Sequence, residues 1–475
     1  MAPLGAVFTP PSWARWAVER LDLPARVTAG ATVCDPTAGE GSLAFALADR
    51  AQATGVLDAA WAGRITLIDR EGDFLESFAR TWHGRYGFAF PEANLVEGDV
   101  VTRPPARRFD FVVGNPPWAS YPELDPEDQE RYRPWFRDLD LVGRPSELLL
   151  GRSRLDVAAL VTARAFALVN EGGRAGFFLP LSLFHSGSAA RWRRWVPDAI
   201  FDLTEARVFP EVATRYGWAE FSLGSRTKAP RYFTGRPDAW VPWDAVQDAP
   251  DGPWRLVPPG ARSPVPRFPL APGQRPRQGL NTGGANAAFH VPSPPTDVDP
   301  ALVHPLVRPG KPEKWILVPY HRDGRILEER ELEASGLAQF WRDWKERLAA
   351  RRGLYLGSQL KRGRWWALLG AGAYAFAPYK VLWSAYGQKR LVPQVWGPRG
   401  DGRVWQADQA LQAYIPCATK DQADQIAAFL GSDAVHEYLA SFRDAGTRSW
   451  AQPGRLTPLW STPPEGGTPE GTTGS

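Results

Sequence analysis

The sequence is poor in cysteine: only Cys34 and Cys417 occur in its 475 residues. They lie far apart along the chain, which argues against a disulfide framework and against a zinc cluster built from cysteines. Such low cysteine usage is typical of proteins in a reducing cytosol, so we expect a cytoplasmic location.

Long apolar runs are also missing. No uninterrupted stretch of about 18 apolar residues occurs, which is the length that a membrane-spanning helix needs. The N-terminus lacks the basic region followed by an apolar run that marks a secretory signal. We therefore expect a protein that is neither membrane-spanning nor secreted.

The overall composition, 44% apolar and 23% charged, is ordinary for a globular protein. The chain is longer than one hydrophobic core usually supports, so we expect two domains. Its net charge of +4 and isoelectric point near 9.0 permit a polyanionic partner without requiring one.

A glycine-rich loop follows the first predicted strand, residues 31–35, and leads into a predicted helix over 42–53. Strand, glycine loop and helix in this order are typical of the nucleotide-binding half of a doubly wound α/β fold. Gly39 and Gly41 allow a ligand to approach the backbone closely. The loop contains Asp35 but no phosphate-binding Gly-Lys-Ser/Thr, which favours an adenosine cofactor that carries an amino acid.

Two more acidic residues stand where later strands end. The strand 64–68 ends at Asp69, which is placed to accept hydrogen bonds from ribose hydroxyls. Asp99 follows a weaker strand around 94–96, and its carboxylate can accept a hydrogen bond from the amine of the cofactor's adenine. Each acid taken alone could be an ordinary solvated loop residue. Open α/β sheets bind ligands at the carboxyl ends of their strands, so the repeated placement indicates a site.

The apolar run 109–114 predicts a buried parallel strand, and Asn115, Pro116, Pro117 and Trp118 follow it. The two prolines fix the backbone and remove N–H donors, leaving carbonyl acceptors. With an amide and an indole beside them, these groups suit a planar ring that bears an exocyclic amine. The alternative is a tight strand-to-loop turn with a buried tryptophan.

The order of these motifs resembles that of S-adenosylmethionine-dependent DNA N6-adenine methyltransferases of the gamma arrangement, similar to the modification enzymes of type II and IIG restriction–modification systems. The motifs are Phe-Thr-Pro-Pro (8–11), Asp-Pro-Thr-Ala-Gly-Glu-Gly (35–41), Asp69, Asp99 and Asn-Pro-Pro-Trp (115–118). The resemblance implies a Rossmann-like class I methyltransferase fold of the α/β class. It also implies a mostly parallel seven-stranded sheet and a C-terminal α+β target-recognition domain.

The resemblance implies a role for each matching residue. For the cofactor S-adenosylmethionine it implies contacts from Thr9, Pro10, Asp35, Gly39, Gly41, Asp69, Asp99 and Asn115. Among these, Thr9 and Pro10 close over the methionine end, and Asp35, Gly39 and Gly41 line the amino acid. Asp69 then contacts the ribose and Asp99 the adenine. The catalytic residues that hold the target adenine are Asn115, Pro116, Pro117 and Trp118.

We expect four regions along the chain: a catalytic domain over 1–228, a linker over 229–278, a target-recognition domain over 279–460 and a disordered tail over 461–475. The linker is proposed because its segment holds twelve prolines and no clear periodicity. Residues 125–146 are interpreted either as a variable loop near the substrate or as a surface insertion.

The second half contains a basic, aromatic-rich segment. Residues 341–403 hold thirteen Lys or Arg and three Asp or Glu, which could form a solvated face or contact a nucleic acid. Beside a base-modifying domain the second interpretation is favoured, with double-stranded DNA as the partner. The residues expected to contact DNA are Asn281, Asn286, Lys361, Arg362, Lys380, Lys389 and Arg390.

These inferences predict a site-specific adenine methyltransferase that rotates its target base out of duplex DNA, serving restriction–modification or phage defence. We expect a monomer that needs no metal, with a separate restriction endonuclease or defence subunit as a partner that the sequence leaves open. Competing hypotheses are an N-methyltransferase acting on RNA or on protein glutamine, and an inactive DNA-recognition subunit. A cytosine N4 methyltransferase would more often carry Ser-Pro-Pro, so Asn115 argues against it.

Overall fold

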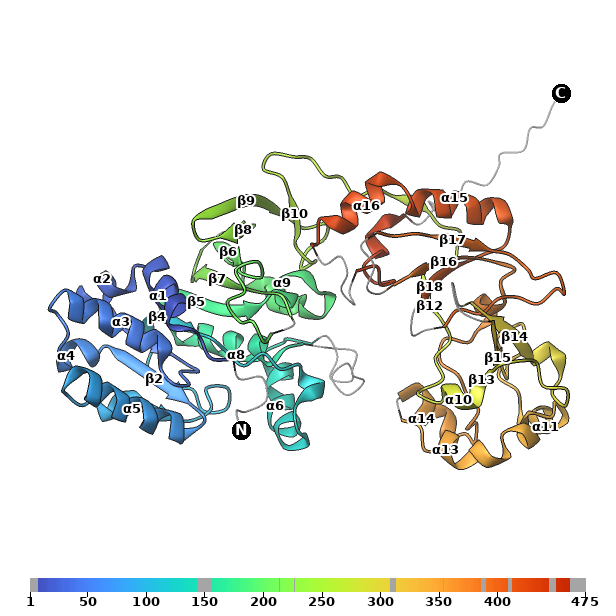
Figure 1. Ribbon diagram of the computed structural model, residues 1–475, viewed down its shortest axis with the longest axis horizontal. Coiled ribbons are helices and arrows are strands. Elements are labelled where there is room, and N and C mark those ends of the chain that lie inside the picture. Colours follow the sequence, from blue (N-terminus) through green and yellow to red (C-terminus); the bar gives the residue numbers. More distant parts are fainter. Residues whose placement is uncertain are drawn as a thin grey trace, which may run out of the picture. The chain divides into compact units, whose positions relative to one another are not determined.

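A computed structural model of the protein describes residues 7–142, 155–212, 214–225, 227–307, 313–352, 354–385, 390–408, 412–443 and 450–461. The chain divides into two compact units, Met1–Arg262 and Ser263–Ser475 (Figure 1). None of the described helices is both long and apolar enough to cross a membrane.

A ten-stranded mixed sheet forms the centre of the first unit, in the order β10-β9-β8-β6-β7-β5-β4-β1-β2-β3. The neighbours β3, β2, β1, β4 and β5 run parallel, and β7 lies antiparallel between β5 and β6. The strands are β1 Val33–Asp35, β2 Ile65–Asp69, β3 Leu95–Glu97, β4 Phe109–Gly114, β5 Val169–Pro180, β6 Ala199–Asp202, β7 Tyr216–Ser222, β8 Arg231–Arg236, β9 Ala239–Val246 and β10 Arg255–Val257.

Helices cover both faces of this sheet (Figure 1). Successive residues of β4 point to opposite faces, so Val112 joins the apolar cluster beneath α8 and Val113 joins the cluster beneath α1, α3 and α5. The helices of the unit are α1 Pro11–Arg20, α2 Leu23–Thr28, α3 Ser42–Ala53, α4 Ala59–Ala62, α5 Gly72–Tyr86, α6 Pro126–Asp138, α8 Val157–Ala165 and α9 Ser182–His185. The predicted strand 109–114 and helix 42–53 are confirmed as β4 and α3.

The prediction of seven strands is wrong, and so is the linker prediction over residues 231–257. These residues form β8, β9 and β10, which extend the sheet beyond β6. Pro242 in β9 pairs with Phe233 of β8, whereas β10 pairs only with residues 244–246 of β9. At Pro242 the strand therefore has one neighbour, and a strand edge tolerates a residue without an N–H. The abundant prolines concealed this strand from sequence analysis.

The second unit is built from small, mostly antiparallel sheets and short helices, which gives it an α+β character over its described residues. Its main sheet has the order β12-β18-β16-β17, and a three-stranded sheet has the order β13-β15-β14. The strands are β11 Phe268–Pro269, β12 Arg277–Gln278, β13 His290–Val291, β14 Val303–Leu306, β15 Lys314–Leu317, β16 Tyr379–Ser384, β17 Gln394–Trp396, β18 Gln412–Cys417 and β19 Trp460–Ser461. The helices are α10 Asn286–Phe289, α11 Glu329–Ala334, α12 Leu337–Phe340, α13 Lys345–Ala349, α14 Leu354–Leu360, α15 Lys420–Leu430 and α16 Asp433–Ala440.

The predicted disordered tail, 461–475, lies outside the described residues except for Ser461, which belongs to β19. The interpretation of 125–146 changes in part, because residues 126–138 form helix α6. Asp125 caps this helix by accepting a hydrogen bond from the Asp128 N–H at 2.9 Å, and Pro126 occupies the first helical position. Residues 143–146 lie outside the described residues.

Candidate functional site

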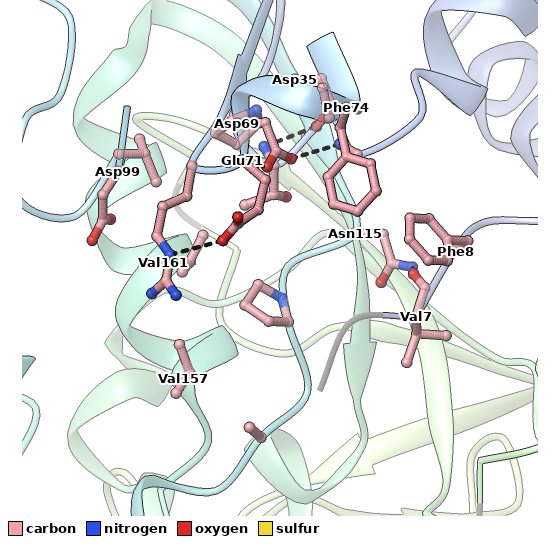
Figure 2. Close-up of a pocket in the computed structure, with 18 of the residues that line it drawn as sticks. Val7, Phe8, Asp35, Asp69, Glu71, Phe74, Asp99, Asn115, Val157 and Val161 are labelled. Carbon is pink, nitrogen blue, oxygen red and sulfur yellow. Dashed lines mark hydrogen bonds and ion pairs between the residues drawn. The ribbon is translucent and has the colours of Figure 1, made fainter. Parts of the chain in front are cut away.

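A cavity of about 300 Å³ lies in the first unit, where the carboxyl ends of β1, β2 and β4 meet. Figure 2 shows Asp99 at one side of this cavity and Asn115 at the other, with Asp69 and Glu71 between them. Of the sequence-predicted residues, those that line it are Thr9, Asp35, Gly39, Asp69, Asp99, Asn115 and Pro117.

The loop after β1 forms one wall. The Oδ1 atom of Asp35 accepts a hydrogen bond from the Thr37 N–H at 3.1 Å, and the carboxyl is only 4% exposed. Burial raises the pKa of Asp35 to about 8. Gly39 has a φ of +52°, the left-handed region that glycine adopts without strain. The wall therefore offers a buried acid that becomes charged readily only beside a cation.

Asp69, the last residue of β2, fixes this loop in place. Its Oδ2 accepts a hydrogen bond from the Gly39 N–H at 2.7 Å, and its Oδ1 accepts one from the Glu71 N–H at 3.0 Å. Burial raises the pKa of Asp69, although these two hydrogen bonds favour the ionised form. Asp69 thus joins the ends of β1 and β2 while it lines the cavity.

Besides the Thr37 hydroxyl oxygen, two buried oxygen atoms of residues that line the cavity have no hydrogen-bond partner in the described chain. The first is Oδ2 of Asp99, whose Oδ1 accepts a hydrogen bond from the Val101 N–H at 2.9 Å. The second is Oδ1 of Asn115, whose Nδ2 donates to the Val7 carbonyl at 2.7 Å and to Thr9 Oγ1 at 3.2 Å. Buried polar atoms are normally paired, so each of these acceptors indicates a ligand that donates a hydrogen bond.

Gly114, the last residue of β4, allows Asn115 to lie close to the β1 loop. A Cβ atom at Gly114 would lie 2.9 Å from Asp35 Oδ1 and 3.3 Å from Thr37 Oγ1. A larger residue would therefore push the ends of β4 and β1 apart. This close approach brings the predicted cofactor loop and the predicted catalytic amide to one cavity.

Four of the predicted residues do not line the cavity: Pro10, Gly41, Pro116 and Trp118. Gly41 has a packing role, because a Cβ atom there would lie 2.2 Å from the Phe78 ring. The Trp118 indole is half-buried and donates to the Phe178 carbonyl at 3.2 Å. Its ring stacks on Tyr216, with centroids 5.5 Å apart and planes 26° apart. Tyr216 therefore already covers one face of the Trp118 indole, the side chain that the sequence predicts will hold the target base.

Sequence reasoning missed a network on α6 that closes the cavity near Asp99. Arg70 Nη1 donates to both carboxylate oxygens of Asp128 at 3.0 Å, which ties α6 to the end of β2. Tyr132, one turn along α6, also lines the cavity. Its pKa is raised to about 12 by burial and by the nearby Asp99 charge, so its hydroxyl is a neutral donor at pH 7. Asp125 followed by Pro126 is a sequence signal for the start of this helix.

The residues predicted to contact DNA lie in the second unit, and several are exposed. Asn286, Lys361, Arg362 and Arg390 are exposed, while Asn281 is partly buried and accepts a hydrogen bond from the Gly283 N–H at 2.7 Å.

The structure contradicts the prediction that Lys380 contacts DNA. Lys389, which was also predicted to contact DNA, lies outside the described residues. Lys380 belongs to β16, which has neighbours on both sides, and its side chain is buried with 1% exposure. Its Nζ donates to the Ala377 carbonyl at 3.1 Å, and burial lowers its pKa to about 7. It cannot contact a phosphate in this structure.

No protein-family model matches the sequence, and a search of curated proteins finds no match. Similarity appears among solved structures. The type IIL restriction–modification enzyme MmeI in complex with DNA aligns with a TM-score of 0.58 at 12% identity, covering 93% of this chain and 64% of that chain. The type ISP enzyme LlaGI with a DNA substrate mimic, as a nuclease-deletion mutant, gives 0.54 at 11% identity over 86% of this chain and 48% of that chain. The ATP-dependent type ISP enzyme LlaBIII bound to DNA gives 0.53 at 11% identity, over 87% and 34%.

The chain shares the fold of these restriction–modification enzymes. The similarity includes both units of the chain, because up to 93% of its residues align. The chain spans 64% or less of the length of each of these three structures, so it corresponds to part of each.

Proposed function

We propose that the protein is a site-specific DNA methyltransferase that transfers a methyl group from S-adenosylmethionine to the N6 atom of adenine in duplex DNA. The observation that carries this proposal is the buried, unpartnered Oδ1 of Asn115 in the same cavity as Asp35 and Asp99. An acceptor held there suits the amine of a base, while the acidic wall suits a cationic cofactor. The shared fold with restriction–modification enzymes supports the same conclusion.

The cavity residues fit S-adenosylmethionine. Among the described residues, seven carboxylates and one arginine line the cavity, which favours a cation and disfavours a phosphate. Asp35 would hold the ammonium group, Asp69 would face the ribose, and Asp99 Oδ2 would accept a hydrogen bond from the cofactor's adenine amine. A volume of about 300 Å³ lies within the range of small-molecule sites.

When bound, S-adenosylmethionine supplies an electrophilic methyl group on a sulfonium sulfur. The chain's own contribution is to position the adenine amine and to change its geometry. The N6 lone pair is delocalised into the ring, so the amine is a poor nucleophile. The Asn115 Oδ1 atom and the Pro116 carbonyl would accept hydrogen bonds from its two N–H groups and favour the tetrahedral nitrogen of the transition state. This is electrostatic preorganisation and needs no strong general base.

The target adenine must leave the DNA stack, which costs a few kcal/mol. Stacking on one aromatic side chain contributes about 1–3 kcal/mol per base, so Trp118 would offset part of that cost. Tyr216 and Phe209 hold the indole, at centroid distances of 5.5 Å and 4.9 Å. The platform is therefore fixed before the base arrives, which reduces the entropy lost on binding.

Replacing Asp128 with alanine should weaken cofactor binding about tenfold without changing DNA affinity. The variant removes the carboxylate that holds α6 to Arg70, and a partly exposed charge-assisted hydrogen bond of this kind contributes roughly 1.5 kcal/mol. Isothermal titration calorimetry with S-adenosylhomocysteine measures the change. Glu127→Ala is the matched control, because Glu127 is on the same helix and paired with Arg131 but does not line the cavity. Equal affinities for the two variants would show that α6 does not shape the site.

Single-molecule sequencing of DNA from cells that express the protein tests the proposed function directly. We expect N6-methyladenine at one position of one short sequence motif, and none in cells that express Asn115→Ala. Purified protein should methylate duplex DNA in preference to RNA or to protein substrates. Methylation of RNA or of a protein glutamine alone would support a competing hypothesis. Absence of cofactor binding would support an inactive DNA-recognition subunit.

A further inference from the structure

A groove of about 710 Å³ lies in the second unit, between residues 270–278 and residues 452–461. Its charged lining differs from that of the catalytic cavity. Arg275 and Arg277 line it, and no Asp or Glu does so among the described residues. The remaining polar side chains of the lining are glutamine amides, hydroxyls and an indole, contributed by Gln274, Gln278, Gln452, Thr457, Trp460 and Ser461.

Arg275 and Arg277 lie two positions apart in the chain, and no carboxylate lines the groove with them among the described residues. No ion pair is formed by Arg275 or by Arg277 in the described part of the chain, and the buried Nε of Arg277 has no hydrogen-bond acceptor. Burial and the charge of Arg275 lower the pKa of Arg277. Two unneutralised cations in one groove repel each other, and an anion between them would remove that repulsion.

The donors of the groove are held in place by the fold. Arg277 lies in β12, which pairs with β18, and its guanidinium carbon lies 3.9 Å above the Tyr374 ring. Trp460 lies in β19, which pairs with β11, and its ring contacts Phe429 at a centroid distance of 5.7 Å. The buried indole Nε1 of Trp460 also has no acceptor in the described chain. Two residues of the groove lining are thus held in place by the fold and carry buried N–H groups that lack acceptors.

We propose that this groove binds the phosphate backbone of the duplex DNA. The inference rests on the proposed function, which requires a duplex, and it assigns a contact surface that sequence reasoning did not single out. Arginine forks match phosphate oxygens geometrically, and indole N–H groups and hydroxyls also donate to phosphates. Contacts of this kind position the duplex without reading its sequence. The residues that read bases would then lie elsewhere on the second unit.

The salt dependence of DNA binding tests the groove. Fluorescence anisotropy with a labelled 30-base-pair duplex, between 50 and 200 mM NaCl, gives the slope of log K against log salt for the wild type, for Arg275→Gln/Arg277→Gln and for Arg275→Gln alone. Each phosphate contact contributes about −0.9 to the slope, so we expect the double variant to lose about 1.8 and the single variant about 0.9. The loss should be equal for duplexes with and without the target motif.

Two further variants distinguish the effect of losing a charge in the groove from an effect of misfolding. Arg277→Lys keeps the charge but not the fork, so we expect a slope within a few tenths of the wild-type value. Arg330→Gln makes the same charge change on the exposed, acidic helix α11, and we expect it to leave the slope unchanged. Unchanged S-adenosylhomocysteine binding by the first unit would show that the double variant remains folded there.

The outcomes distinguish the groove from the proposed function. If the wild type binds the duplex and the double variant has the same slope, the groove is not a DNA surface. If single-stranded RNA competes better than duplex DNA in the wild type, the assignment to a duplex is overturned. If the wild type binds S-adenosylhomocysteine but no nucleic acid, the proposed function fails, and the groove inference that rests on it fails with it.

Discussion

Asn115→Ala should lower the rate of methyl transfer at least about a hundredfold, which is the effect of removing one preorganised electrostatic contact in an active site. Among the described residues of the loop after β4, only Asn115 lines the cavity with a buried side-chain oxygen that has no hydrogen-bond partner in the chain. The variant removes this oxygen. Affinity for duplex DNA should remain within a few-fold of wild type, because phosphate contacts dominate that affinity. Single-turnover kinetics with a tritiated methyl donor measures the rate, and anisotropy measures the binding.

Asn170→Ala is the matched control for this variant. Asn170 is also half-buried in the first unit, where its Nδ2 donates to Asp110 Oδ1 at 2.8 Å, but it does not line the cavity. We expect its single-turnover rate to stay within a few-fold of wild type. Full activity of Asn115→Ala, or an equal loss in both variants, would show that the amide has no specific role.

Asp35→Asn should strongly weaken cofactor binding and yet stabilise the protein at alkaline pH. Burial raises the pKa of Asp35 to about 8 in the folded chain, against an ordinary value of 3.8. Between those two pH values the folded chain holds a proton that the unfolded chain has released. The free energy of unfolding therefore falls as the pH rises from about 4 to about 8, and it levels off above that. Asparagine does not titrate, so the variant lacks the contribution that Asp35 makes to this fall in the free energy of unfolding.

Thermal unfolding at pH 4.5 and at pH 8 tests the stability effect. We expect the melting temperatures of wild type and Asp35→Asn to be close at pH 4.5, with the variant higher at pH 8. Loss of a buried charged partner costs about 2–5 kcal/mol, so calorimetry at pH 7.5 should show cofactor affinity reduced roughly thirtyfold or more. Asp73→Asn, an exposed change on α5, should alter neither property. A variant that is less stable than wild type at pH 8 would contradict the assignment of a buried, neutral Asp35.

The first unit was largely predictable, because its signals are local. An apolar run predicted β4, a glycine loop before an apolar helix predicted β1 and α3, and acids at strand ends predicted one site at one sheet edge. The carboxyl ends of neighbouring parallel strands lie together, so Asp35, Asp69 and Asn115 converge in the structure as the motif order indicates.

Other features depend on contacts between distant residues. Arg70 and Asp128 are 58 positions apart, and no local pattern indicates that they form an ion pair beside the cavity. Prolines concealed β9, because a strand that has one neighbour at Pro242 tolerates a missing N–H. Lys380 was expected at the surface because its segment is basic. In the structure it is buried in β16, a strand that pairs with both β17 and β18.

The sequence by itself determined the order of the strands that hold the acids and the residue types at their ends, because a strand and the loop after it are encoded by contiguous residues. Only the tertiary structure decided which oxygen atoms remain without partners, which lysine is buried and where cations gather without counter-charges. Those properties depend on which distant segments come into contact, since burial and pairing are set by neighbours in space and not by neighbours in the chain.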